Sequence, residues 1–287
     1  MLQVARLSPK LLGEAGELVE SFVRGQQNPD GAFRNRAGES DLYYTVFGLE
    51  ALIALQVETP AQQVAEYLRT HGTGEGRDFV HLACLARCWA SVTKDMSAVP
   101  VEPILAALER FRTRDGGYNQ TPDAPYGTAY AAFLALGAYQ DLGVPMPDAG
   151  TLLDSLEILR AGDGGYGNLP GMPFGVTTAT AAAVTLRRQF HCEPSAELAS
   201  WLLARFLPAG GFFAVPGAPI PDLLSTATAL HALSGLHVPM QSLRDPCLDF
   251  VDSLWTNRGG FYGHWSDDCI DTEYTYYGLL ALGHLKE

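Results

Sequence analysis

The sequence predicts an all-α fold, an (α/α)6 barrel of six helical hairpins, from a repeated tripeptide and the segments around it. A Gly-Gly-aromatic signal recurs at spacings of 48, 46 and 49 residues. Each copy is followed, about ten residues later, by an apolar run rich in Ala and Leu. A fixed period in this range is typical of repeat architectures. The four copies are Gly116-Gly117-Tyr118, Gly164-Gly165-Tyr166, Gly210-Gly211-Phe212 and Gly259-Gly260-Phe261.

The first two hairpins carry weaker forms of the signal. Gly31-Ala32-Phe33 is a degenerate copy, and the 85 residues between it and Gly116 are about twice the period. This gap indicates that one copy has lost its glycines. The second hairpin still keeps Asp78 at the start of an apolar run, as the first hairpin keeps Asp41.

Each repeat combines an amphipathic outer helix with an inner helix that is apolar on nearly every side and therefore buried. The predicted outer helices span residues 8–24, 59–70, 101–113, 149–160, 194–206 and 242–255. The predicted inner helices span residues 41–55, 78–94, 126–141, 175–189, 222–235 and 271–286. Because the inner helices run parallel, we expect their N-termini to share one end of the barrel with the Gly-Gly loops. The functional site is expected at that end.

Composition and charge limit the partners and the compartment. The repeats run through all 287 residues, so we expect a single domain over residues 1–287. A net charge of -13 disfavours nucleic acid and anionic membranes, because both attract basic patches. Five scattered cysteines form no readable disulfide framework and favour a reducing cytoplasm. We find no signal-peptide pattern, and no apolar run reaches the roughly 18 residues that a transmembrane helix needs.

The repeat resembles a known family unit. A Gly-Gly-aromatic signal, about eleven residues, an Asp and an Ala/Leu-rich helix are similar to the prenyltransferase/squalene-oxidase repeat. That repeat builds the β subunits of protein prenyltransferases and the barrels of class II terpene cyclases. The best matches are Gly259 to Leu282, with Asp271, and Gly210 to Leu230, with Asp222. The resemblance covers essentially the whole chain. It is strong evidence for the fold and weak evidence for the reaction.

The resemblance implies a zinc site that this sequence does not keep. Protein prenyltransferases hold a catalytic zinc through an Asp, a Cys and a His, and the matching positions here are Asp222, Leu224 and Tyr274. Leu has no ligand atom and neutral Tyr rarely ligates, so zinc is not expected. The loops over residues 212–221 and 261–270 also lack the Arg and Lys that would hold a diphosphate.

A class II terpene cyclase is the second reading that the resemblance offers. Such enzymes protonate an alkene with the middle Asp of an Asp-x-Asp-Asp motif. The nearest stretch is Asp268-Cys269-Ile270-Asp271, where Ile270 takes the place of the acid. These cyclases also place the site between two barrels, and this chain has one.

Carboxylates cluster where the inner helices begin. Asp267, Asp268, Asp271 and Glu273 lie within seven residues. Clustered carboxylates raise one another's pKa, so one can stay protonated as a general acid, and together they can hold a diphosphate through Mg²⁺. The alternative is that each Asp is a helix N-cap. The candidate catalytic residues are Asp222, Asp268, Asp271 and Tyr274.

Aromatic side chains on the inner helices predict a cavity for an apolar ligand. The rings of Tyr43, Tyr276 and other residues suit a prenyl chain and stabilise an allylic carbocation. The alternative is that the rings fill the barrel, although buried Tyr hydroxyls need partners. The candidate substrate-binding residues are Tyr44, Phe47, His81, Arg87, Trp89, Tyr126, Tyr130, His231, His264 and Tyr277.

The sequence therefore favours a zinc-independent, cytoplasmic enzyme that acts on an isoprenoid or a similar long apolar substrate. A terpene-cyclase-like acid catalyst and a non-catalytic lipid-binding or scaffold protein are the alternatives. No cofactor is assigned, although Mg²⁺ is possible. An α-type partner subunit is possible but not indicated. Arg87, if it reaches the cavity, would favour diphosphate binding over the scaffold reading.

Overall fold

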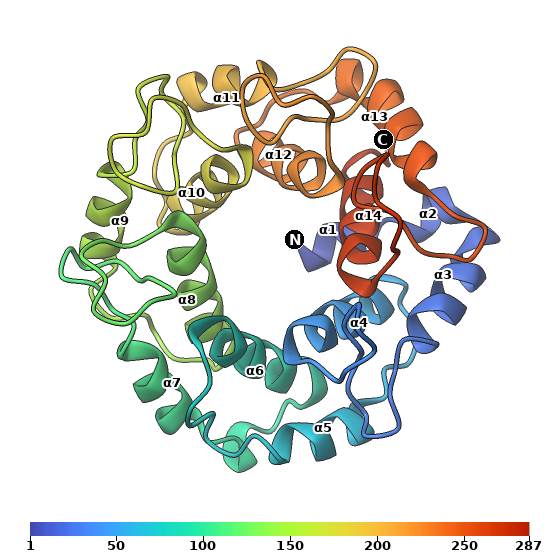
Figure 1. The fold of residues 1–287 in the computed structure, drawn as a ribbon, viewed down its shortest axis with the longest axis vertical. Helices are drawn as coiled ribbons and strands as arrows, with labels where there is room; N and C mark the ends of the chain where they lie inside the picture. The colour runs from blue at the N-terminus through green and yellow to red at the C-terminus, as the bar shows by residue number, and fades with distance from the viewer. Residues whose placement is uncertain (287) are drawn as a thin grey trace.

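A computed structural model describes residues 1–286 and confirms the all-α barrel. Within these residues the chain forms fourteen α-helices and one short 3-10 helix, η1 (Met96–Ala98), with isolated β-bridges in place of strands. Twelve of the helices pair into six hairpins arranged as a closed double ring (Figure 1).

The inner ring is continuous. Each inner helix contacts the next one in the chain, and the last contacts the first, so the ring closes between the first and the sixth hairpins. The inner helices are α4 (Leu42–Ala54), α6 (Phe79–Val92), α8 (Ala129–Asp141), α10 (Thr177–Gln189), α12 (Leu223–Gly235) and α14 (Thr272–His284).

The outer ring covers the inner one. Its helices are α3 (Ala15–Arg24), α5 (Ala61–Arg69), α7 (Val101–Glu109), α9 (Ala149–Glu157), α11 (Ala196–Leu203) and α13 (Gln241–Leu254). The predicted boundaries hold to within a few residues, with one exception. The segment predicted as one helix over residues 8–24 is split into α2 (Pro9–Leu12) and α3, because Gly13 takes a positive φ of 53°.

The Gly-Gly-aromatic motif joins an outer helix to the inner helix of the same hairpin. Its aromatic ring is fully buried in every copy, as at Phe33, Tyr166 and Phe261. In four of the five copies its first glycine allows close approach to a neighbouring outer helix, and Gly164 is the exception. At Gly259, where φ is 92°, an added Cβ would lie 2.1 Å from the backbone oxygen of Leu18 on α3, so no other residue fits without a shift.

The N-termini of the inner helices lie at the same end as these motifs. Four of the six are capped by an Asp side chain that accepts a backbone N–H bond, and α8 is capped by Thr128. The capping aspartates are Asp41, Asp78, Asp222 and Asp271. Such caps satisfy N–H groups that the helix itself leaves unpaired.

A short helix that the sequence analysis did not anticipate lies at the opposite end. Helix α1 (Leu2–Ala5) packs against α14 and α4, and Figure 1 places the N-terminus in the middle of the ring. The carbonyl of Val4 sits where a side chain on Gly283 would be, so this glycine allows the contact. None of the helices described is long and apolar enough to cross a membrane.

Candidate functional site

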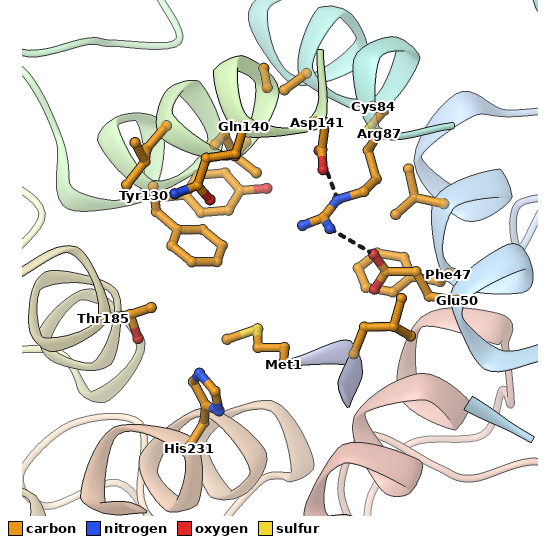
Figure 2. Close-up of a pocket in the computed structure, with 18 of the residues that line it drawn as sticks. Met1, Phe47, Glu50, Cys84, Arg87, Tyr130, Gln140, Asp141, Thr185 and His231 are labelled. Atoms are coloured by element: carbon orange, nitrogen blue, oxygen red, sulfur yellow. Dashed lines mark ion pairs between the residues drawn. The ribbon is translucent and has the colours of Figure 1, made fainter. Parts of the chain in front are cut away.

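A cavity of about 330 Å³ occupies the centre of the inner ring. Residues from all six inner helices and from α1 line it. Six aromatic rings contribute to its wall, and Figure 2 shows several of the lining side chains around the open centre. The six are Tyr43, Phe47, Tyr130, Phe133, Tyr276 and Tyr277. The prediction of an aromatic-lined cavity instead of a filled barrel is therefore confirmed.

A carboxyl group lies next to this aromatic wall, toward the N-terminal ends of the inner helices. The Tyr43 hydroxyl donates a hydrogen bond of 2.6 Å to Glu273 Oε1. Burial raises the pKa of Glu273 to about 7, although the Tyr43 hydrogen bond acts in the opposite direction. Burial raises the pKa of Tyr130 and Tyr277, which both line the cavity, and the Glu273 charge acts in the same direction. Glu273 is thus a carboxyl that exchanges its proton near neutral pH, beside the cavity.

An ion-paired group closes the opposite end of the cavity. Arg87 on α6 binds Glu50 on α4 through Nη1 at 3.3 Å and Asp141 on α8 through Nε at 3.0 Å. In Figure 2 the guanidinium lies between the two carboxylates, and its remaining nitrogen points into the cavity. Burial raises the pKa of Asp141 to about 6, and the Arg87 charge limits the shift.

The same end of the cavity holds further polar groups. The ring of His231 on α12 lies 3.1 Å, Nδ1 to Nε2, from that of His284 on α14. Burial lowers the pKa of His231 to about 2 and that of His284 to about 3, so both rings are neutral at physiological pH. The Tyr276 hydroxyl is buried and has no hydrogen-bond partner among residues 1–286. Arg188 on α10 also lines this end.

The predicted acidic cluster is organised by a cation from the first hairpin. Arg36 donates from Nε to Asp271 Oδ2 at 2.7 Å and from Nη2 to Asp267 Oδ2 at 3.0 Å. Its guanidinium also lies 5.5 Å from the ring centroid of Tyr274. Asp268 is exposed. The carboxylates do not converge on an empty centre, because Arg36 occupies the space between two of them.

A second carboxylate group surrounds His81. Its Nδ1 lies 2.7 Å from Asp78 Oδ2, and its Nε2 lies 3.7 Å from Asp41 Oδ1. Asp41 is the main cause that raises the pKa of His81 to about 9, so the ring is charged at neutral pH. His81 therefore joins the caps of α4 and α6.

The structure brings about half of the predicted binding residues to the cavity. Those that line it are Phe47, Arg87, Tyr130, His231 and Tyr277. Those that do not are Tyr44, His81, Trp89, Tyr126 and His264. Tyr126 was expected on an inner helix, but α8 begins only at Ala129 because Thr128 caps it. Among the candidate catalytic residues, Asp222 and Asp271 are N-caps, and Tyr274 stacks with Arg36.

Sequence reasoning missed several charged or polar residues at the Arg87 end of the cavity, namely Glu50, Asp141, Arg188 and His284. Glu50 is the one charged residue of α4, and a charged group on a buried apolar helix needs a partner. An isolated charge on an apolar helix therefore identifies Glu50 as a residue that needs a partner. It does not identify the helix that carries the partner, Arg87. Asp141 is the last residue of α8. A charged residue at the end of a helix is usually exposed to solvent, so the sequence gives no sign that Asp141 belongs to a cavity.

The residues at the zinc positions of protein prenyltransferases do not fit a zinc ion. Asp222 uses Oδ1 to cap α12 and Leu224 offers no donor atom. Burial raises the pKa of Tyr274 to about 12, which keeps its phenol protonated. Over residues 1–286, no group of three or more His, Cys, Asp or Glu side chains is placed to hold a metal ion. Asp267 and Asp271 are both paired with Arg36 in this arrangement.

The sequence matches the prenyltransferase alpha-alpha toroid domain over residues 12–71 and 172–287, more than half of the chain. The protein belongs to this family. The unmatched residues 72–171 contain the inner helix of the second hairpin, the third hairpin and the outer helix of the fourth. A comparison with curated proteins finds no match.

Solved structures share the toroid. The type II terpene cyclase MstE from Scytonema, in complex with geranylgeranyl dihydroxybenzoate, is similar with a TM-score of 0.65 and 14% identity, over 98% of both chains. The Candida albicans protein geranylgeranyltransferase-I complexed with GGPP is similar with a TM-score of 0.67 and 12% identity, over 94% of this chain and 90% of that one. At such identities the likeness is one of fold.

Proposed function

We propose that this toroid protein is a zinc-independent enzyme that binds an isoprenoid or a similar apolar substrate in its central cavity and moves a proton on it through Glu273. The observation that carries the proposal is the 2.6 Å hydrogen bond between Glu273 and Tyr43, a residue of the cavity wall. It places a protonatable group beside an aromatic pocket whose volume lies near the lower end of the roughly 300–1,000 Å³ typical of ligand sites.

The pKa of Glu273, about 7, suits general acid–base catalysis at neutral pH. A group of this strength protonates an oxygen substituent or removes a proton next to a developing cation. It is too weak an acid to protonate an isolated alkene, which is the first step of class II terpene cyclases. The position of Ile270 in the nearest Asp-x-Asp-Asp stretch points the same way. Acid–base chemistry therefore ranks above cyclase-type alkene protonation.

The aromatic residues of the cavity wall, Tyr43 and Asp271 each support acid–base catalysis by Glu273. The faces of Phe47, Tyr130 and Tyr277 provide the apolar wall and attract positive charge that develops on the chain. The Tyr43 hydroxyl donates to ionised Glu273 and so stabilises the carboxylate that remains after proton transfer. Asp271, held by Arg36, fixes the start of α14, the helix on which Glu273 lies.

The known neighbours agree with an isoprenoid ligand. One is complexed with a geranylgeranyl dihydroxybenzoate and the other with GGPP, so toroids of this shape accept prenyl chains. The five cysteines are free, with Cys84 and Cys88 buried on α6, which fits a reducing compartment such as the cytoplasm.

The test is conversion of prenyl compounds by the purified protein. Geraniol, farnesol, geranylgeraniol and their diphosphates are incubated with the protein in EDTA, extracted and analysed by mass spectrometry. We expect turnover of at least one compound in EDTA, and its loss in Glu273→Gln. Stabilisation of the protein by these compounds without any turnover would instead identify it as a lipid-binding protein. Turnover only after zinc is added would contradict the proposal.

A further inference from the structure

The end of the cavity opposite Glu273 carries donors that no contact within the protein uses. Arg87 has five N–H groups, and its ion pairs with Glu50 and Asp141 engage Nη1 and Nε. The Nη2 group is directed at the cavity centre, as Figure 2 shows. The Arg87 side chain keeps 36% of its surface accessible, whereas Glu50 keeps 6%. The Arg87 guanidinium is therefore accessible to a ligand, whereas the Glu50 carboxylate is largely covered.

A second unused donor borders the same end. Tyr276 lines the cavity and only 2% of its surface is exposed, yet its hydroxyl makes no hydrogen bond of good geometry in residues 1–286, and Glu50 is the acceptor nearest to forming one. It is close enough to Glu50 and Arg87 for their charges to act on it. A buried hydroxyl without a partner costs free energy, so such groups usually meet water or a ligand. Two independent donors thus lack an acceptor at one place in the cavity.

The charges around this place restrict the acceptor. Glu50 and Asp141 lie directly beside Arg87, and Arg188 is the other charged side chain at this end. His231 contributes no charge, because its ring is neutral. Glu50 and Asp141 already offset the Arg87 charge, and the Met1 amino group, whose pKa is lowered by burial, also borders this end. A diphosphate bound to Arg87 would bring two or three negative charges next to the buried Glu50, at a large electrostatic cost.

We propose that the Arg87–Tyr276 end of the cavity is an anchor for an uncharged oxygen acceptor, a carbonyl or hydroxyl group, at one end of the substrate. The inference rests on the proposed function, because it deepens the same cavity. The oxygen accepts from Arg87 Nη2 and from the Tyr276 hydroxyl, while the hydrocarbon part lies along the aromatic wall toward Glu273. Anchoring in this way selects alcohols and carbonyl compounds over both hydrocarbons and diphosphates.

Binding of three matched probes tests the anchor, namely farnesol, β-farnesene and farnesyl diphosphate, with dissociation constants measured by calorimetry. We expect farnesol to bind about tenfold or more tighter than farnesene, because a hydrogen bond to a charged donor is gained. We expect farnesyl diphosphate to bind more weakly than farnesol. Tyr276→Phe should weaken farnesol binding several-fold and leave farnesene binding unchanged.

Tyr276→Phe is informative because the Tyr276 hydroxyl makes no hydrogen bond of good geometry, so the unliganded protein should melt at or near the wild-type temperature. Tyr139→Phe is the matched control. Tyr139 is also buried, but its hydroxyl bonds to Glu109 outside the cavity, so its loss should lower the melting temperature without changing farnesol affinity.

The outcomes separate the anchor from the proposed function. If farnesene and farnesol bind equally well, the anchor is wrong and the isoprenoid cavity stands. Tighter binding of the diphosphate, lost in Arg188→Gln, also overturns the anchor and assigns this end to a charged head group. If none of the three probes binds, the proposed function and the anchor fail together.

Discussion

The hydroxyl of Tyr43 and the carboxyl of Glu273 are joined by a 2.6 Å hydrogen bond, although the two residues are 230 positions apart in the sequence. The bond spans the seam where the first inner helix meets the last, so it forms only when the ring closes. It therefore couples closure of the toroid to the protonation of Glu273.

Substitution of Glu273 by Gln should stabilise the protein above neutral pH. Folding raises the pKa of Glu273 from 4.5 to about 7, so the folded state holds a proton that the unfolded state releases between these values. The penalty grows as the pH rises from 4.5 and is complete above pH 7, on the order of 3 kcal/mol. Melting curves should give a higher transition temperature for Glu273→Gln at pH 8 and a similar one at pH 4.5. An equal difference at both values would contradict a buried titrating Glu273.

Substitution of Tyr43 by Phe should move the titration of Glu273 to higher pH. The Tyr43 hydroxyl stabilises the ionised carboxylate, so its loss leaves burial unopposed and raises the pKa further. Carbon NMR of labelled glutamate carboxyls measures the titration, and Glu273→Gln assigns the signal. Tyr44→Phe is the control, since the Tyr44 hydroxyl makes no bond to Glu273. A shift of the same size in both variants would mean that general changes in solvation are responsible.

Substitution of Asp271 by Asn should cost little stability and preserve turnover. Asn caps helices about as well as Asp, so the bond to the Tyr274 N–H is kept and only the ion pair with Arg36 is lost. Because Arg36 is partly exposed, we expect a loss of about 1 kcal/mol in denaturant unfolding. Turnover per folded molecule should stay near that of the wild type, with the pH profile moved slightly to lower pH because the Asp271 charge helps to raise the pKa of Glu273. Loss of turnover with an intact fold would assign the acid to Asp271 instead of Glu273.

The fold was predictable because its signals are local. The period of the Gly-Gly-aromatic motif, the apolar inner segments and the aspartate caps each depend on neighbouring residues, and all twelve principal helices follow from them. The position of α1 depends on packing against α14 and α4, which no local pattern carries.

The site was predictable only in its composition. An aromatic cavity follows from rings on buried helices, but which rings face inward depends on the rotation of each helix, so Tyr277 lines the cavity and Tyr44 does not. The pairing of Glu50 with Arg87 depends on how three helices align along the barrel axis. The acidic cluster was visible in the sequence, whereas its counter-ion Arg36 comes from the first hairpin.

Two glycines at equivalent positions of the repeat should respond differently to Ala. Gly259 and Gly164 have nearly the same φ, 92° and 89°, so both variants carry the same backbone strain of about 1–2 kcal/mol. At Gly259 a Cβ would lie 2.1 Å from Leu18 O, whereas at Gly164 no atom lies within 4 Å. Gly259→Ala should therefore lose roughly 2 kcal/mol more than Gly164→Ala in urea unfolding. Equal losses would show that α3 moves away freely.

The Arg87 ion pairs offer the strongest test of charge inside the barrel. Arg87→Met leaves Glu50 and Asp141 without their cation, and we expect a loss near the lower end of the about 3–5 kcal/mol typical of broken buried pairs, because Arg87 is partly open to the cavity. The pKa of Asp141 is already raised to about 6, and without Arg87 it rises further. The folded variant then takes up protons that the unfolded chain does not bind until lower pH. The deficit should therefore shrink as the pH falls from 8 to 5.

Removal of the two carboxylate charges in the Arg87→Met background distinguishes charge from packing. In the triple variant Arg87→Met, Glu50→Gln, Asp141→Asn no buried charge is left unpaired, so most of the lost stability should return and its dependence on pH should disappear. Urea unfolding at pH 5 and pH 8 measures both effects. If the triple variant is as unstable as Arg87→Met at every pH, the cause is the lost contact of the arginine stem. The carboxylates would then lie in a better solvated environment than their burial indicates, and a diphosphate would no longer be disfavoured at this end of the cavity.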